Sequence, residues 1–170
     1  MKKCCFTGHR PKSLPWGYDE SKETCIEFKK ALSFVINKAI ENGYSYFICG
    51  LAEGFDTIAL ETLLEIKKNN SNIIIEGAIP CIGQELKWNE HSQERYRKNL
   101  KLLDKTTIIS NTYTNTCMHE RNDYMLDNSE LVIACYNGGS GGTMSTITKA
   151  KKKNKKIIVI NPKTLEIKGV

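Results

Sequence analysis

The chain alternates between short apolar runs and segments with helical spacing, and this alternation limits its fold more than any other feature. Alternation of this kind predicts βα units and a parallel sheet. The expected strands are 3–7, 46–49, 73–80, 107–109, 131–135 and 156–160. The expected helices are 25–39, 54–66, 83–103, 118–126 and 143–153. We therefore predict an α/β fold with a Rossmann-like, doubly wound, mostly parallel sheet flanked by helices.

The length of the chain limits how many domains it holds. Its 170 residues suffice for one ordinary domain with a proper core and are too few for two. Neither an internal repeat nor a linker is visible, so we expect a single domain over residues 1–170. The N-terminus is basic and then apolar, but its apolar run stops at Thr7, far short of a signal sequence. A cytoplasmic protein with no membrane partner is expected.

The seven cysteines show no C-x-x-C spacing and no paired cysteine and histidine cluster. They are expected to be small buried residues, with neither a metal site nor a cofactor. The net charge of +6 comes largely from lysines crowded between Lys149 and Lys156. These side chains form either a solvated helix face or a patch for nucleic acid.

The glycine-rich segment after the fifth expected strand is the clearest candidate for a binding loop. It comprises Gly138, Gly139, Ser140, Gly141, Gly142 and Thr143. Such a turn leaves N–H groups free at a helix N-terminus, where the peptide dipoles favour an anion such as phosphate. We expect Thr143 to cap the helix and donate its hydroxyl. A tight turn without a ligand is the alternative interpretation.

Other polar residues follow the remaining strands, so they are expected at the same sheet edge, where doubly wound folds bind their ligands. Thr7, Gly8, His9 and Arg10 end the first strand, and His9 is either a structural residue, a ligand contact or a proton-transfer group. Gly50, Glu53, Gly54 and Asp56 follow the second strand. The two carboxylates either accept hydrogen bonds from ribose hydroxyls or cap the helix.

Two large side chains complete the candidate site. Trp88 either packs in the core or stacks on a base. Arg121, in the first turns of a helix, is either a salt-bridge partner or a planar clamp for an anion.

Several of these motifs resemble a known superfamily. Met118-His119-Glu120-Arg121, the following Met125, the segment 129–134 and Gly141-Gly142-Thr143 closely resemble the LOG phosphoribohydrolases. The opening motif at 7–11, the Gly50-x-x-x-Gly54-x-Asp56 turn and Trp88 resemble the YpsA branch of the same superfamily, SLOG. This resemblance implies a Rossmann-like domain that binds nucleotides or nucleotide-derived ligands, including ADP-ribose-type signals. It also implies that a homo-oligomer is compatible with the chain.

The resemblance leaves three hypotheses about function. The first is a module that senses or sequesters a nucleotide or an ADP-ribose or NAD-type ligand. The second is a phosphoribohydrolase, but the glutamate that LOG enzymes carry three residues beyond the threonine is Thr146 here. Hydrolysis would then need a displaced carboxylate from Glu53, Asp56, Glu120 or Asp123. The third is a single-stranded nucleic-acid binder related to DprA.

Overall fold

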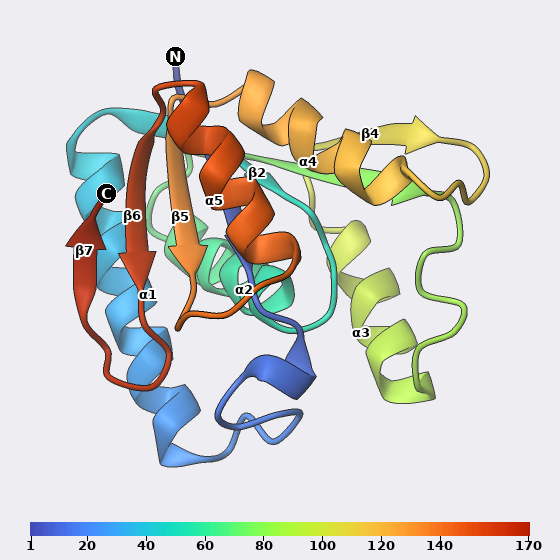
Figure 1. The fold of residues 1–170 in the computed structure, drawn as a ribbon, viewed down its shortest axis with the longest axis horizontal. Coiled ribbons are helices and arrows are strands. Elements are labelled where there is room, and N and C mark those ends of the chain that lie inside the picture. The colour runs from blue at the N-terminus through green and yellow to red at the C-terminus, as the bar shows by residue number, and fades with distance from the viewer.

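A computed structural model describes residues 1–170 and contains one seven-stranded sheet (Figure 1). The strands are β1 (Lys2–Gly8), β2 (Tyr44–Cys49), β3 (Ile74–Cys81), β4 (Lys105–Ser110), β5 (Leu131–Cys135), β6 (Lys156–Ile160) and β7 (Ile167–Gly169). The helices are α1 (Glu23–Glu41), α2 (Phe55–Lys67), α3 (Glu90–Leu100), α4 (Cys117–Asp127) and α5 (Gly142–Lys152), with a 3-10 turn η1 at Pro11–Ser13.

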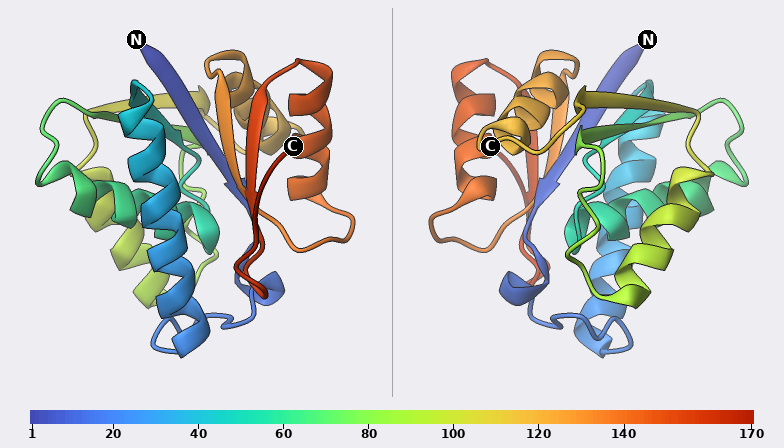
Figure 2. Two further views of the ribbon diagram at one scale, coloured as in Figure 1. Left: turned by 90° about the vertical axis from the view of Figure 1, so that its left-hand side faces the viewer. Right: turned by 90° about the vertical axis from the view of Figure 1, so that its right-hand side faces the viewer.

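The strand order is β4-β3-β2-β1-β5-β6-β7, and only β7 is antiparallel to its neighbour. Helices α1, α2 and α3 cover one face of the sheet, and α4 and α5 cover the other (Figure 2). The chain therefore builds one half of the sheet outward from β1 and then returns to build the other half. The predicted doubly wound, mostly parallel fold is confirmed.

The central strands β1 and β5 are buried on both faces, because helices lie on each side of them. All five residues of β5 are buried, as are Cys4 to Phe6 of β1. Continuous apolar runs are typical of such strands. The larger core cluster joins the sheet to α1 and α2, and the smaller one joins it to α4 and α5. All seven cysteines are free and buried, as expected for small core residues.

Most expected elements are present, with two differences. Helix α3 starts at Glu90, whereas helical spacing predicted a start near Gly83. Asn89 accepts a hydrogen bond from the Ser92 N–H and so caps this helix, while residues before it form turns. Strand β7 was not predicted, since its three residues are exposed and carry no alternating pattern. None of the helices combines the length and the apolar character that crossing a membrane requires.

Candidate functional site

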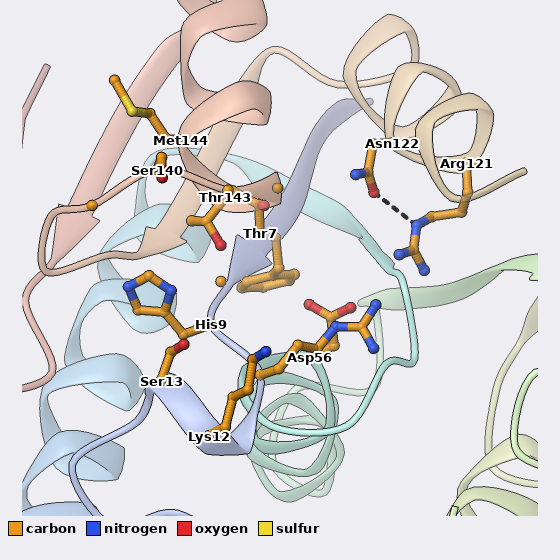
Figure 3. A pocket seen from close by; sticks show the side chains of 16 residues that line it. Thr7, His9, Lys12, Ser13, Asp56, Arg121, Asn122, Ser140, Thr143 and Met144 are labelled. Atoms are coloured by element: carbon orange, nitrogen blue, oxygen red, sulfur yellow. Dashed lines mark hydrogen bonds between the residues drawn. The ribbon is translucent and has the colours of Figure 1, made fainter. Parts of the chain in front are cut away.

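The largest group of predicted site residues surrounds a cavity of about 420 Å³ at the carboxyl ends of β1 and β5. Thr7 pairs with Ala134 and Gly8 with Cys135, so the loops that leave the two strands start side by side. Because the chain turns in opposite directions on either side of β1, these loops diverge and leave a crevice. Figure 3 shows Thr7, His9, Asp56, Arg121 and Thr143 around this space. We call it the first cavity.

The glycine-rich loop forms one wall of the first cavity. Gly138, Gly139 and Gly141 adopt φ values of 106°, 92° and 137°, which L side chains rarely adopt. The Tyr136 hydroxyl donates a hydrogen bond of 2.5 Å to the Gly139 carbonyl oxygen and so holds the loop. Helix α5 begins at Gly142, and its N-cap is Gly141, which has no side chain to cap it. The expectation that Thr143 caps this helix is therefore wrong, because Thr143 lies inside the first turn.

The absence of a capping side chain has a chemical consequence. The N–H groups of Gly142, Thr143 and Met144 have no acceptor within the protein. Thr143 is buried and lines the cavity together with Gly139, Ser140, Gly141 and Gly142. Free N–H groups at the positive end of a helix form a suitable site for an anion.

Arg121 reaches the same cavity from α4 on the other side. Its side chain is only 4% exposed. Its Nε donates a hydrogen bond of 2.8 Å to Asn122 Oδ1, and one terminal nitrogen donates to the Gly50 carbonyl oxygen. Met118 Sδ lies 3.9 Å from the other terminal nitrogen. No carboxylate oxygen lies within 4.0 Å of the guanidinium nitrogens, so Arg121 forms no ion pair. Burial lowers its pKa, and the charge of Asp56 opposes this shift.

Asp56 supplies the one carboxylate in the first cavity. It lies in the first turn of α2, is 7% exposed and accepts a hydrogen bond of 3.2 Å from the Ala52 N–H. The helix N-cap is Gly54, so Asp56 does not cap the helix. Burial raises the pKa of Asp56 above its ordinary value, while Arg121 and Arg10 oppose the shift.

The segment after β1 adds further polar groups. His9 Nε2 lies 2.9 Å from Asn137 Oδ1, which ties this segment to the loop after β5. Burial lowers the pKa of His9, and the contact with Asn137 opposes that shift. Arg10 lines the cavity beside Lys12 and Ser13, which are not among the predicted site residues. A signal for these two residues exists in the sequence, because Pro11 favours a tight turn, and the turn η1 keeps Lys12 and Ser13 next to Arg10. Asn122 and Met144 were missed as well, although each follows a selected residue.

Five of the predicted site residues do not line the first cavity, namely Gly50, Glu53, Gly54, Trp88 and Gly138. Gly50 lies behind it, where an added Cβ would be 2.6 Å from a guanidinium nitrogen of Arg121. Gly54 has a φ of 88° and packs its backbone against the His9 carbonyl. Glu53 and Trp88 line a separate cavity, and Gly138 lines a third.

Gly8 has a packing role in addition to lining the cavity. A Cβ at this position would be 2.3 Å from the ring of Phe55. The missing side chain therefore lets the first residue of α2 pack against the end of β1. This packing explains the glycine without a ligand.

The other candidate carboxylates lie away from the cavity. Glu120 is exposed on α4, and Asp123 forms an ion pair of 2.8 Å with Lys149. Thr146, at the position of the LOG glutamate, donates its hydroxyl hydrogen bond to the Gly142 carbonyl oxygen at 2.9 Å. Asp56 is therefore the one candidate of the four that the structure places beside Arg121 and the glycine-rich loop.

Solved structures with the same fold include two DNA processing proteins. The chain superposes on DprA from Streptococcus pneumoniae with a TM-score of 0.63 and 16% identity, covering 98% of this chain and 52% of that one. For DprA from Helicobacter pylori, in a structure described for its single-stranded DNA binding mode, the TM-score is 0.60 with 18% identity. That superposition covers 93% of this chain and 64% of the other. The chain thus spans about half to two thirds of these proteins.

Relatives of similar length are found by sequence. The SPbeta prophage-derived protein YoqJ of Bacillus subtilis, described as uncharacterized, is 31% identical over 143 residues, covering 76% of this chain and 83% of YoqJ. A UPF0398 protein of Brevibacillus brevis is 24% identical over 155 residues, covering 90% of this chain and 82% of the relative. The family model YpsA, described as the YspA SLOG family, matches residues 4–166. The chain therefore belongs to the YpsA SLOG family.

Proposed function

We propose that the protein binds a nucleotide or nucleotide-derived ligand by its phosphate in the first cavity, and senses or sequesters that ligand. Arg121 carries this proposal, because a guanidinium so deeply buried is costly unless an anion balances its charge. Within the protein it has no ion-pair partner. A phosphate in the cavity would supply the missing negative charge.

The surroundings of Arg121 support phosphate over a carboxylate ligand. The free N–H groups at the start of α5 face the same cavity and suit several oxygen atoms at once. Arg10 and Lys12 add positive charge at the exposed rim. Three cationic side chains thus line the cavity against one carboxylate, Asp56. A doubly charged phosphate monoester or a diphosphate matches this excess.

Native mass spectrometry with AMP, NAD and ADP-ribose tests the proposal directly. We expect an intact ligand to bind the wild-type protein and to be lost in Arg121→Met. Release of free base would instead support the hydrolase hypothesis, with Asp56 as the displaced carboxylate. Asp56→Ala would then stop base release and leave ligand affinity nearly intact, because Asp56 contributes no positive charge to phosphate binding.

A nucleic-acid strand is the second candidate ligand, favoured by the likeness to a DprA described for single-stranded DNA binding. The lysines near the C-terminus support it less than their number suggests. Lys149 and Lys153 are ion-paired with Asp123 and Asp127. Binding of an oligonucleotide whose affinity falls steeply with salt concentration would favour this candidate over a small ligand.

A further inference from the structure

A second cavity, of about 180 Å³, lies at the same edge of the sheet. Its walls share chain segments with the first cavity: Pro11 lies between Arg10 and Lys12, and Gly54 and Thr57 lie close to Asp56. Four aromatic side chains line it, namely Trp16, Tyr18, Trp88 and Tyr96. A cavity well below the roughly 300–1,000 Å³ of drug-sized ligand sites fits one ring system rather than a whole cofactor.

Two buried polar atoms among the lining residues have no hydrogen-bond partner. Glu53 Oε1 is an acceptor, and Trp16 Nε1 is a donor on a side chain that is 2% exposed. Buried polar atoms are rarely left unpaired in proteins, because each costs its lost hydration. Both atoms belong to residues that line the second cavity, so a ligand group that carries a donor and an acceptor would pair them once the lining side chains admit it.

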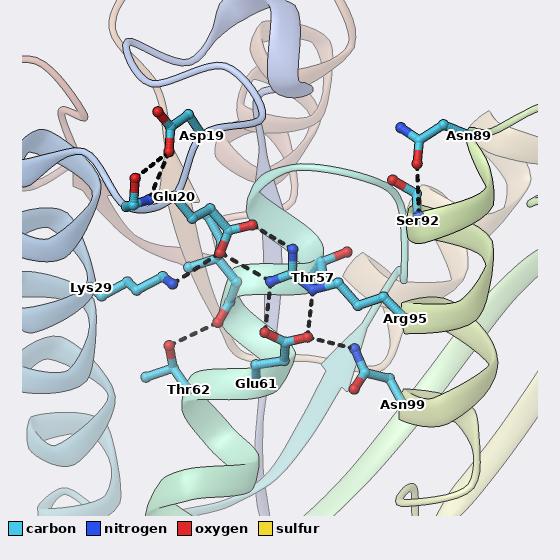
Figure 4. Close-up of polar contacts among 12 residues, drawn as sticks. Asp19, Glu20, Lys29, Thr57, Glu61, Thr62, Asn89, Ser92, Arg95 and Asn99 are labelled. Carbon is cyan, nitrogen blue, oxygen red and sulfur yellow. Dashed lines mark hydrogen bonds and ion pairs between the residues drawn. The ribbon is translucent and has the colours of Figure 1, made fainter.

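A polar network that includes Glu20 and Arg95 fixes part of the wall of the second cavity (Figure 4). Arg95 of α3 donates to both carboxylate oxygens of Glu61 at 2.7 and 2.6 Å, and to both of Glu20 at 2.5 and 3.0 Å. Lys29 pairs with Glu20 at 2.9 Å. The charge of Glu20 is thus balanced, and Glu53 is the lining carboxylate without an ion pair.

We propose that the second cavity binds the nucleoside end of the ligand whose phosphate lies in the first cavity. The flat ring of a base packs against Trp88, which is half-buried and meets Tyr96 edge to face at 5.4 Å. An amino or hydroxyl group donates to Glu53 Oε1, and a ring nitrogen accepts from Trp16 Nε1. This inference rests on the proposed function, since the phosphate orients the ligand.

Tryptophan fluorescence reports on this cavity alone, because the chain contains 2 tryptophans and both line it. ADP-ribose is compared with ribose 5-phosphate, which keeps a sugar phosphate but lacks a base. We expect ADP-ribose to change the fluorescence and ribose 5-phosphate to bind without changing it. Glu53→Met removes the acceptor at similar side-chain length, so it should weaken ADP-ribose by about tenfold, the value of one hydrogen bond to a charged group, and leave ribose 5-phosphate unaffected.

Glu65→Met is the matched control, since Glu65 lies on α2 outside the second cavity and its side chain is 71% exposed. It should bind both compounds as the wild-type protein does. Trp88→Ala provides a second variant, which should weaken ADP-ribose selectively while the remaining Trp16 reports folding. A different result is that ADP-ribose binds in an Arg121-dependent way and yet is weakened by neither the Glu53 nor the Trp88 substitution. In that case the second cavity is not a subsite and the proposed function stands. If neither compound binds at all, both proposals fail.

Discussion

Replacing Arg121 by methionine should have opposite effects on ligand binding and on stability. Two guanidinium N–H groups donate to oxygen atoms of the protein and a third faces sulfur. About two donors therefore remain for a ligand. At about 1.5 kcal/mol or more for each hydrogen bond to a charged group, their loss should weaken AMP or ADP-ribose by about 100-fold or more.

The same substitution removes a buried charge that has no ion-pair partner. A buried charge without a close counter-ion costs its lost hydration, and an apolar side chain of similar length removes that cost. We expect the unliganded variant to gain about 1 kcal/mol, which raises the Tm by about 2–4 °C for a chain of this length. Calorimetric titration measures the first effect and thermal unfolding without ligand measures the second.

Arg97→Met serves as the control, because Arg97 is exposed on α3 and lines neither cavity. It should change neither quantity. Ligand affinity within threefold of the wild-type value in Arg121→Met would refute the role given to this side chain. A marked loss of stability would show that the contact with the Gly50 carbonyl outweighs the cost of burying the charge.

Three further substitutions test the surrounding structure. Gly50→Ala should lower the free energy of unfolding in urea by about 1–3 kcal/mol and impair ligand binding, because the added Cβ would be 2.6 Å from a guanidinium nitrogen of Arg121. Wild-type stability and binding in this variant would contradict the packing described. Because burial raises the pKa of Asp56, its contribution to stability is present at low pH and is lost as the pH rises through that pKa. Asp56→Asn should therefore be more stable than the wild-type protein at neutral pH. An unchanged dependence of stability on pH would argue against this explanation. Burial alone would raise the pKa of Glu76, but hydrogen bonds from Thr107, Tyr124 and Tyr46 lower it, so Glu76 stabilises the fold above its unfolded pKa and this is lost on acidification. Glu76→Gln should therefore cost about 1–3 kcal/mol at neutral pH and little in acid; equal losses at both would count against this explanation.

The fold was predictable because its signal is local and repeated. Each buried strand reads as an apolar run, and each helix shows its own spacing. The sheet edge that holds the first cavity followed from the same pattern, since the polar motifs other than that of Arg121 came after strands. The turn before α3 was harder to predict, because Trp88 and Tyr96 both fit a helix that starts earlier than Asn89 allows.

The division of the candidate site into two cavities could not be read from the sequence. Glu53 and Asp56 are three residues apart, and the sequence gives no reason to separate them. In the structure, the backbone of Gly54 packs against the His9 carbonyl, so Asp56 faces Arg121 while Glu53 faces the aromatic side chains. That separation depends on contacts between distant segments, which no periodic pattern in one chain encodes.

Because all seven cysteines are buried, their reaction with a thiol reagent reports local opening of the fold. A thiol must be exposed and deprotonated before it reacts, so an alkylating reagent modifies each cysteine only when the surrounding structure opens. Cys25 lies in α1 and Cys117 in α4, on opposite faces of the sheet. Mass spectrometry of the labelling order would reveal whether the two helical layers open together or in sequence, and no label would have to be engineered into the chain.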